Sequence, residues 1–278
     1  MSSQAVLTPL RVPEGIPGLL RDIIHERTGI YFEDSRLKVL LEKLEPLAQQ
    51  RGFKSFLEYY YALKDEVNNS WESVWEALSV QETYFWRESA QIELLTSHIV
   101  PEWFRKSSSL LRIWSAACAS GEEPYSIAIA LAEAGFGAHP IEITGSDAFP
   151  AALKKAGEGV YRERSFRSLP PALREKYFRP VEGGWALSPE IARRVTFKRA
   201  NLFESGEVAP LARAQVVFCR NVFIYFSAHS IRQTVAIIGA RMPPRGYLFV
   251  GASESLLRMT TDFELLDISG ALVYRRLG

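Results

Sequence analysis

A change of pattern near residue 90 constrains the fold of this chain most. Beyond it, short apolar runs of strand length alternate with longer segments of helical periodicity. The strand-like runs are "LLRIWSA", "IEITGSD", "AQVVFC" and "GYLFVGA", and the helical segments between them include "EPYSIAIALAEAG", "PAALKKAGEG" and "SIRQTVAIIGARM". Parallel strands need long crossovers of this kind, so the alternation predicts a doubly wound α/β sheet. The final "FELLDISGALVYRRL" predicts an antiparallel hairpin.

The preceding residues show helical periodicity without a strand signal. Apolar residues recur at helical spacing in "IPGLLRDIIHERTGI", and Gly29 suits a C-terminal cap. A second helical pattern, "SRLKVLLEKLEPLAQQRG", is expected to be interrupted or to end near Pro46. Two shorter amphipathic segments, "SFLEYYYALK" and "SWESVWEALS", follow. These patterns predict an N-terminal all-helical domain.

The expected organisation is therefore one helical domain and one sheet domain. Residues 1–88 form the helical domain with its linker, and residues 89–278 form a Rossmann-like domain. The alternation is broken between residues 160 and 197 by "SLPPALREKYF" and "EGGWALSPEIARRVTF". We expect a helix there and a small inserted antiparallel β-subdomain at about 178–197, in which Gly183 and Gly184 suit a tight hairpin turn.

Charge and composition argue against several classes of partner. The chain has 33 basic and 32 acidic residues, so its net charge of +1 gives no electrostatic reason to expect nucleic acid. No apolar run reaches the ~20 residues of a membrane helix, and the N-terminus lacks a signal-peptide pattern. We expect a cytoplasmic protein without membrane insertion. The scattered histidines predict no metal site, and Cys118 and Cys219 are expected to be reduced, packed thiols.

The junction between the first strand and its helix, "SAACASGEEPYS", has the character of a ligand site. Ligands of open α/β sheets bind beyond the carboxyl ends of the strands. The small residues up to Gly121 allow close approach, but the turn is neither G-x-G-x-x-G nor a P-loop. Glu122 and Glu123 repel phosphate and suit a cation. An ordinary helix with acidic residues in its first turn is the alternative.

The second strand ends in "GSDAF", which places Asp147 at its tip. A carboxylate there can accept hydrogen bonds from both hydroxyls of a ribose. A solvated loop aspartate is the alternative. Together with the acidic turn, Asp147 fits a nucleoside that carries a positive group and no phosphate, and S-adenosylmethionine is such a molecule.

Polar residues at two other places fit the same site. The linker "LSVQETYFWRES" sets Gln81, Thr83 and Arg87 among aromatic residues, and "VVFCRNVFIYFS" sets polar residues just after a buried strand. An amphipathic linker packed on the core and a strand end with capping groups are the alternatives.

These motifs together resemble the CheR family of chemotaxis receptor methyltransferases. "QETYFWRE", "IWSAACASGEEPYSIAI", "SDAFPAALKKAGEGVY", "NLF", "FCRNVFIYF" and "GYLFVGASESL" occur in the order typical of that family, over residues 16–277. The resemblance implies a protein-glutamate O-methyltransferase acting in chemotaxis signal transduction. Such an enzyme transfers the methyl group of S-adenosylmethionine to glutamates on the cytoplasmic helices of methyl-accepting chemoreceptors, giving glutamyl methyl esters and S-adenosylhomocysteine. A glutamate carboxylate has a pKa near 4.3 and needs no general base, so the lack of a histidine-based catalytic cluster is no objection.

The resemblance also implies a role for each site residue. Glu123 holds the methionine ammonium and Asp147 the ribose hydroxyls. Arg87, which positions the incoming carboxylate, and Tyr225, which shapes the methyl pocket, are the expected catalytic residues. Asn201 and Leu202 line the adenine. The rest of the cofactor pocket consists of Gln81, Thr83, Arg87, Gly121, Arg220 and Asn221.

The sequence departs from the family pattern at three places. Gln81 stands where asparagine is usual, and Phe149 stands where a second acid often follows the strand-two aspartate. The segment "SRLKVLLEKLEPL" is nearly neutral, whereas this helix is usually rich in basic residues that dock the receptor. The departure puts the usual mode of receptor docking in doubt, although not the chemistry.

Other functions remain to be weighed against this one. An NAD-dependent oxidoreductase is disfavoured by the lack of G-x-G-x-x-G, and a non-catalytic S-adenosylmethionine-binding docking module by the presence of Glu123, Asp147, Arg87 and Tyr225. A methyltransferase of the same family in a non-motility chemosensory pathway is not distinguished by sequence. The compact segment "FRPVEGGWALSPEIARRVTF" leaves little edge for an added peptide strand. We therefore expect a monomer that does not depend on a receptor C-terminal pentapeptide.

Overall fold

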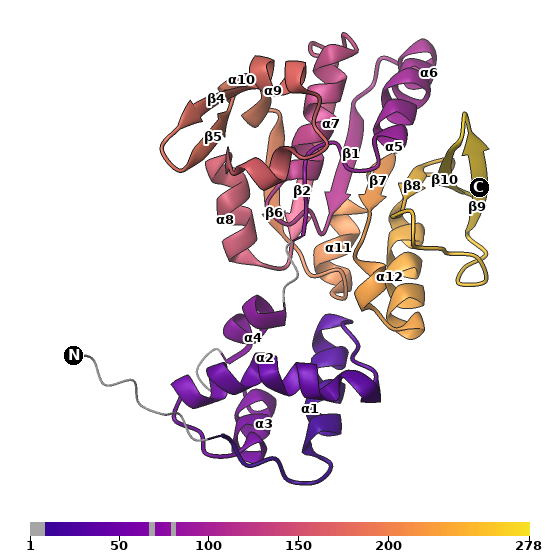
Figure 1. The fold of residues 1–278 in the computed structure, drawn as a ribbon. Helices are drawn as coiled ribbons and strands as arrows, with labels where there is room; N and C mark the ends of the chain where they lie inside the picture. The colour runs from indigo at the N-terminus through magenta and orange to yellow at the C-terminus, as the bar shows by residue number, and fades with distance from the viewer. Residues whose placement is uncertain (1–8, 67–69, 79–81) are drawn as a thin grey trace. The chain divides into compact units, whose positions relative to one another are not determined.

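The computed structural model describes residues 9–66, 70–78 and 82–278, and these fall into two compact units. One unit holds the chain up to Val80 together with Tyr225–Ser227, and the other holds Gln81–Ile224 and Ala228–Gly278. The boundary expected from the sequence lies a few residues later, after residue 88. Figure 1 shows the helical unit in indigo and purple and the sheet unit in magenta to yellow.

The first unit is all-helical, as predicted. Its amphipathic helices bury one stripe each around a common core that includes Leu20, Leu40, Tyr59 and Val74. Gly29 caps the first helix as expected, since it has a φ of 73° and its N–H donates to the carbonyl of His25. The helices are α1 Ile16–Thr28, η1 Asp34–Arg36, α2 Leu37–Gln50, α3 Phe56–Lys64 and α4 Ser70–Leu78.

The expectation that the second helix is interrupted or ends near Pro46 is wrong, because α2 continues through Pro46 to Gln50. Proline in a helix interior costs about 3 kcal/mol relative to alanine. Leu40, Leu44 and Ala48 lie on one face of α2 and are fully buried. Packing on both sides of the proline therefore outweighs its intrinsic cost.

The second unit is built on a doubly wound mixed sheet, as predicted. The order of its strands is β6-β2-β1-β7-β8-β10-β9, and the run from β6 to β8 is parallel. The chain reverses direction across the sheet between β1 and β7, which makes that point the topological switch. The strands are β1 Leu111–Ala116, β2 Ile141–Asp147, β6 Val195–Arg199, β7 Val216–Cys219, β8 Tyr247–Phe249, β9 Phe263–Ile268 and β10 Ala271–Arg276.

The terminal hairpin β9–β10 is confirmed, and β10 pairs antiparallel with β8. Helices cross between the parallel strands, with α7 packed on β1 and β2 and α8 packed on β2 and β6 (Figure 1). A turn of π-helix, Leu95–Ile99, joins α5 to α6, which precede β1. The helices of this unit are α5 Ser89–Leu94, α6 Val100–Lys106, α7 Glu122–Glu133, α8 Pro150–Glu158, α9 Pro171–Tyr177, α10 Pro189–Ala192, α11 Ser205–Leu211 and α12 Ala228–Arg241.

The inserted β element is a small antiparallel sheet in the order β3-β5-β4. It comprises β3 Val160–Tyr161, β4 Phe178–Val181 and β5 Gly184–Leu187, so it starts upstream of the expected segment. The "RRVTF" end of that segment contributes instead to β6, the edge strand of the main sheet. Gly184 is required by close packing, since a Cβ there would lie 2.3 Å from the carbonyl oxygen of Tyr161.

The described residues contain neither a helix that could span a membrane nor a cluster of metal-binding side chains. Within them, no helix combines the length and the apolarity needed to cross a membrane. The same residues bring together no group of three or more His, Cys, Asp or Glu side chains able to hold a metal ion. Cys118 and Cys219 are both buried, and neither forms a disulfide there.

Candidate functional site

The predicted site lies at the carboxyl ends of the parallel strands of the second unit. The turn after β1, the tip of β2 and the loops after β7 and β8 all emerge at this edge, because parallel strands end on the same side. The linker Thr83–Glu88 contributes side chains to the same edge.

The linker is anchored by its aromatic residues. Phe85 is fully buried, with its ring 4.8 Å from that of Tyr161 and 5.0 Å from that of Phe178. The N–H of Trp86 donates to Ser126 Oγ on α7 at 3.0 Å. Arg87 follows these anchors, with Nη1 donating to the carbonyl of Glu82 at 3.1 Å. The linker thus packs on the core through its aromatic residues and also carries polar groups. It fits both interpretations of its sequence, the amphipathic linker and the contributor to a ligand site.

The turn between β1 and α7 has an unusual backbone. Ala117, Ala119 and Gly121 all have positive φ, at 53°, 47° and 89°. Left-handed backbone is unfavourable for alanine, and such strain is typical of functional sites. A Cβ on Gly121 would lie 2.9 Å from the Cβ of Ala156 on α8. Gly121 therefore allows this turn to pack closely against its neighbours.

Asp147 at the tip of β2 is tied to that same turn. Its Oδ2 accepts from the N–H of Ala119 at 2.8 Å, and its Oδ1 accepts from the N–H of Phe149 at 3.0 Å. The residue is buried, and burial raises the pKa of its carboxyl, with the backbone donors opposing the shift. Each carboxylate oxygen retains a lone pair for a further donor. Asp147 is thus oriented rather than solvated, unlike the loop aspartate of the alternative interpretation.

The two adjacent glutamates of α7 point into different surroundings. Glu122 is buried and accepts from Ser120 Oγ at 2.8 Å and Ser165 Oγ at 3.0 Å. Glu123 accepts from Ser115 Oγ at 2.6 Å, and its Oε2 lies 3.6 Å from Nε of Arg220. Burial raises the pKa of the Glu123 carboxyl, while Arg220 and the serine lower it. Glu122 stabilises the turn, and Glu123 faces the switch point between β1 and β7.

Arg220, directly after β7, is the most buried cation of this edge, with its side chain 1% exposed. Its Nη2 donates to the carbonyl of Arg87 at 2.6 Å and lies 3.5 Å from Oε2 of Glu88. Within residues 9–66, 70–78 and 82–278, its Nε and Nη1 have no hydrogen-bond partner. Buried donors of a guanidinium are rarely left without a hydrogen bond, so these two nitrogens are available to a ligand.

Two glutamates that were not predicted organise the loops around Arg220. Glu88 accepts from Asn221 Nδ2 at 3.3 Å and from the N–H of Ala252 at 3.2 Å. Glu254 accepts from the N–H groups of Asn221, Phe223 and Gly251 at 2.8, 2.7 and 2.6 Å. Both lie in quoted motifs, "QETYFWRE" and "GYLFVGASESL", but apart from Gly251 the partners named here are distant in sequence.

The remaining predicted residues are placed less centrally. The N–H of Ala200 donates to the carbonyl of Asp147, which sets Asn201 and the buried Leu202 just past the paired ends of β2 and β6. Asn201 accepts from the N–H of Phe203 through Oδ1. The structure therefore brings Glu123, Arg87, Arg220 and Asn221 into one network. Thr83 is half-buried in the linker. Gln81 lies outside the described residues, and Tyr225 groups with the helical unit.

The chain can now be compared with known proteins. Residues 18–79 match the family model of the CheR methyltransferase all-alpha domain, and residues 81–271 match that of the CheR methyltransferase SAM-binding domain. The chain is 37% identical over 260 residues to chemotaxis protein methyltransferase 2 of Vibrio cholerae, covering 88% of this chain and 87% of the relative. It is 33% identical over 265 residues to chemotaxis protein methyltransferase 1 of Pseudomonas aeruginosa, covering 92% and 96%.

The family models cover most of the chain, and the relatives align with it over nearly their whole length. The all-alpha match coincides with the helices α1 to α4, and the SAM-binding match with the unit that carries the sheet. The chain belongs to the CheR methyltransferase family, and its sheet unit is the S-adenosylmethionine-binding domain.

Proposed function

We propose that this chain methylates glutamate side chains on the cytoplasmic helices of chemoreceptors, and that it does so in the cytoplasm as a monomer. The names of its relatives support a chemotaxis role, and the second domain supports S-adenosylmethionine as the methyl donor. The observation that carries the proposal is the pairing of Arg220 with Glu123 at the switch point of the sheet.

This pair suits the amino-acid end of S-adenosylmethionine. That end carries an ammonium and a carboxylate, so it needs one anion and one cation held side by side. Glu123 supplies the anion, and Nε and Nη1 of Arg220, which have no hydrogen-bond partner among the described residues, supply charged donors. Because these groups are buried, their interactions with a ligand are stronger than they would be in water.

Asp147 suits the nucleoside end of the same molecule. Its two oxygens are oriented by the N–H groups of Ala119 and Phe149, and ribose hydroxyls are the donors such a carboxylate binds. Asn201 and Leu202 follow the neighbouring strand β6 and are proposed to line the adenine. The strained turn of residues 117–121 lets the ligand approach the backbone.

S-adenosylmethionine supplies a methyl group bonded to a positively charged sulfur. An oxygen of the receptor glutamate attacks that carbon in line, so an O–CH₃ bond forms as the S–CH₃ bond breaks and the electron pair stays on sulfur. No proton moves, because the carboxylate is ionised near neutral pH. The protein's task is to orient and desolvate the nucleophile.

Arg87 and Tyr225 are the proposed catalytic residues. Arg87 is half-buried, and among the described residues only Nη1 of its guanidinium forms a hydrogen bond, to a backbone carbonyl. This leaves donors to position an incoming carboxylate. Tyr225 is assigned to the methyl pocket by the family motif "CRNVFIYF", with Gln81 and Thr83 assigned to the cofactor pocket on the same ground.

The receptor's C-terminal pentapeptide is not needed in this proposal. The small sheet pairs its strands β3, β5 and β4 in four-residue stretches or shorter, which leaves a short edge for strand addition. Titration with pentapeptides that end in an aromatic residue should give no saturable binding. Micromolar binding abolished by changes within residues 183–187 would overturn this part of the proposal.

The reaction itself is tested with methyl-labelled S-adenosylmethionine and membranes that contain the organism's chemoreceptors. The expected product is label on a receptor-sized band that base releases as methanol, since glutamyl esters are base-labile. Receptors with the methylated glutamates changed to alanine provide the control. Base-stable label, or none on the receptor, contradicts glutamate as the substrate.

A further inference from the structure

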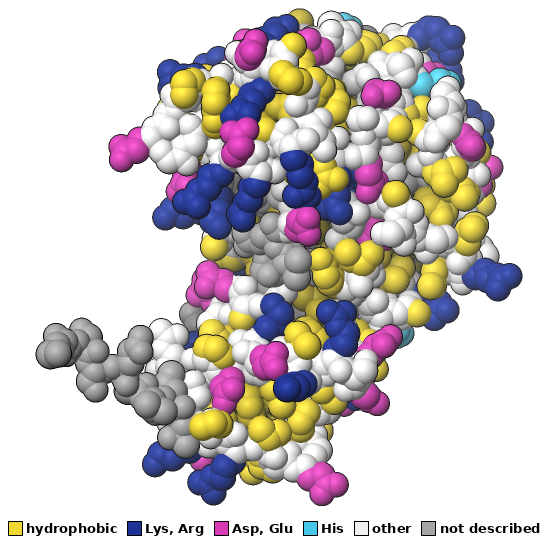
Figure 2. Space-filling view, in the orientation of Figure 1, with side chains coloured by type: hydrophobic (Ala, Val, Ile, Leu, Met, Phe, Trp, Pro, Cys, Tyr) yellow, Lys and Arg dark blue, Asp and Glu magenta, His cyan; other side chains and the backbone are white. Residues whose placement is uncertain are grey.

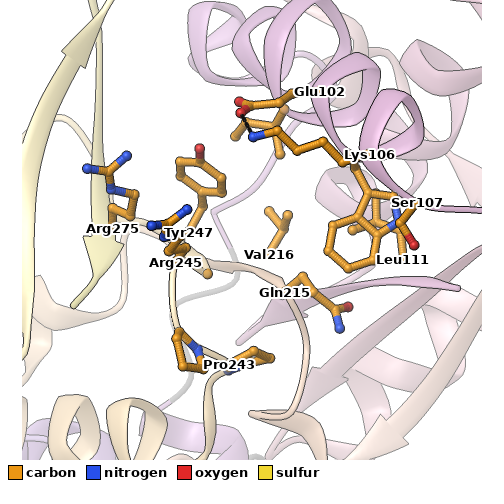
Figure 3. Close-up of a pocket in the computed structure, with 14 residues that line it drawn as sticks. Glu102, Lys106, Ser107, Leu111, Gln215, Val216, Pro243, Arg245, Tyr247 and Arg275 are labelled. Carbon is orange, nitrogen blue, oxygen red and sulfur yellow. Dashed lines mark hydrogen bonds and ion pairs between the residues drawn. The ribbon is translucent and has the colours of Figure 1, made fainter. Parts of the chain in front are cut away.

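A second pocket opens at the opposite end of the sheet from the cofactor site. It has a volume of about 340 Å³ and lies at the amino-terminal ends of the parallel strands, where Leu111 begins β1, Val216 begins β7 and Tyr247 begins β8 (Figure 3). The proposed cofactor residues follow the carboxyl ends of these strands. A ligand here would therefore not touch the methyl-transfer site.

The walls of this pocket are mainly apolar and flat. Leu111 and Val216 form a fully buried floor. The half-buried rings of Trp103 and Tyr247 and the ring of Pro243 provide planar surfaces. The indole N–H of Trp103 already donates to the carbonyl of Ser109 at 3.1 Å. Such walls favour a flat apolar body, and the volume is that of a small-molecule site.

The charges around the pocket leave one cation without a partner. Lys106 pairs with Glu102, and Arg275 pairs with Glu264 through Nε at 2.8 Å and Nη2 at 2.7 Å. Arg245 also lines the pocket, and within the described residues its guanidinium has no hydrogen bond or ion pair. A single uncompensated cation beside apolar walls complements a ligand with one negative charge.

The backbone at Arg245 supports a role for this side chain. The N–H of Gly246 donates to the carbonyl of Pro243 at 3.0 Å, which closes a turn with Arg245 in its third position. Arg245 has a φ of 63°, a conformation that this position of a type II turn normally assigns to glycine or asparagine. The glycine is required one residue later, because a Cβ on Gly246 would lie 2.7 Å from Met242 Cγ. Strain retained by an arginine is typical of a functional position.

We propose that this pocket binds a small organic monoanion with a flat apolar body, of the aromatic carboxylate class. The ring lies against Trp103, Tyr247 and the proline wall, and the carboxylate pairs with Arg245. This inference is independent of the proposed methyl transfer, since it rests on residues at the other end of the strands.

The test uses 2-naphthoate and its neutral counterpart 2-naphthamide as probes of the intact chain, titrated by calorimetry and ligand-observed NMR. We expect the acid to bind with a Kd of about 1 mM or tighter, as its size allows, and more tightly than the amide. Arg245→Gln should weaken binding of the acid about five-fold or more and leave the amide unchanged. Trp103→Leu should weaken both probes.

Arg241→Gln is the matched control, because Arg241 is exposed at the end of α12 and does not line the pocket. Binding of S-adenosylhomocysteine serves as the check on folding and should be the same in every variant. The proposal is overturned by absence of binding at the solubility limit of the acid. Equal affinity for acid and amide, or an affinity of the acid unaffected by Arg245→Gln, overturns it as well.

Discussion

At the scale of single residues, two carboxyl groups of the site share one electrostatic property. Burial raises the pKa of both Glu123 and Asp147, and the donors around each group, Arg220 or backbone N–H groups, oppose the shift only in part. An acid with a raised pKa in the folded chain keeps its proton to a higher pH than the unfolded chain does. In the unliganded protein its contribution to stability is therefore lost as the pH rises through the folded value.

This property predicts the pH dependence of cofactor binding. An ammonium or a pair of hydroxyls needs an ionised carboxylate to donate to, so the affinity for S-adenosylhomocysteine should fall as the pH is lowered through the raised pKa values. Calorimetry from neutral pH down to the acid limit of the folded protein measures it, and binding at the acidic end should be accompanied by proton release. An affinity that is constant over this range contradicts the assignment of Glu123 and Asp147.

Substitution of Asp147 should also weaken cofactor binding more than substitution of another acidic residue on the same strand. Asp147→Asn removes a charged acceptor from ribose and should weaken binding of S-adenosylhomocysteine by about 1–3 kcal/mol. Glu142→Gln, at the exposed start of β2, is the control and should leave the affinity unchanged. Calorimetry on both variants tests the role, and equal losses would assign the effect to the strand rather than to the site.

Individual site residues could be predicted where one strand and its following turn carry the signal. Asp147 was accessible in this way because it ends a strand whose pattern is clear, and Glu123 because it lies in the first turn of the helix that follows the turn after β1. The network of Arg220 with Glu88 and Glu123 was not, because its members come from three distant segments and meet only through the order of the strands. The same holds for Glu254, since its backbone partners Asn221, Phe223 and Ile224 lie 33, 31 and 30 residues earlier in the chain.

At the scale of elements, Glu254 joins the loops that follow β7 and β8. It accepts backbone N–H groups from both loops, and it is half-buried. A Cβ on Gly251 would lie 2.5 Å from Asn221 Nδ2 and 2.8 Å from Glu254 Oε2, so the two loops pack too closely for a side chain at this position. The position of Arg220 and Asn221 thus depends on this glutamate.

Glu254→Gln should therefore destabilise the sheet unit. The amide keeps one acceptor oxygen and loses the charge, and we expect a loss of about 1–3 kcal/mol in the free energy of unfolding. Denaturant unfolding measures it. Glu163→Gln is the control, since Glu163 is exposed and, among the described residues, pairs with Arg174 alone in a surface pair of the kind that contributes about 0–1 kcal/mol. A Glu254→Gln variant as stable as the control would contradict the role given to these loops.

Elements differed in how well their sequence predicted them. The strands β1, β2, β7 and β8 carry short apolar runs followed by turn residues, and all four were predicted from the sequence. The edge strand β6 was assigned to the inserted element, because its exposure alternates and its pairing with β2 is set by the tertiary fold. The helix α2 passes Pro46 for a tertiary reason as well, since the burial of Leu44 and Ala48 is not a local property.

At the scale of the whole molecule, positive charge is concentrated on one part of the sheet unit. Lys154, Lys155, Arg162 and Arg164 are exposed on and just after α8, and Figure 2 shows dark-blue side chains gathered over this region. The chain as a whole has a net charge of only +1. A receptor helix rich in glutamates, the substrate proposed above, would be complementary to such a surface.

Reversal of this charge should weaken the encounter with the receptor. The double variant Lys155→Glu with Arg164→Glu should raise the KM for receptor methylation. Its kcat and its affinity for S-adenosylhomocysteine should be unchanged. Arg232→Glu, exposed on α12, is the control. Steady-state methylation at two salt concentrations measures the effect, because attraction between surface charges is screened by salt. An unchanged KM would place the receptor elsewhere.

The most direct measurement of the central claim is a calorimetric comparison of two ligands. S-adenosylhomocysteine carries the amino-acid end that Glu123 and Arg220 are proposed to hold, and methylthioadenosine lacks it. The account predicts one-to-one binding of S-adenosylhomocysteine to the intact chain and binding of methylthioadenosine weaker by about a hundred-fold or more, as lost charged hydrogen bonds imply. Glu123→Gln should remove most of that difference. No binding of S-adenosylhomocysteine, or equal affinity for the two ligands, would contradict it.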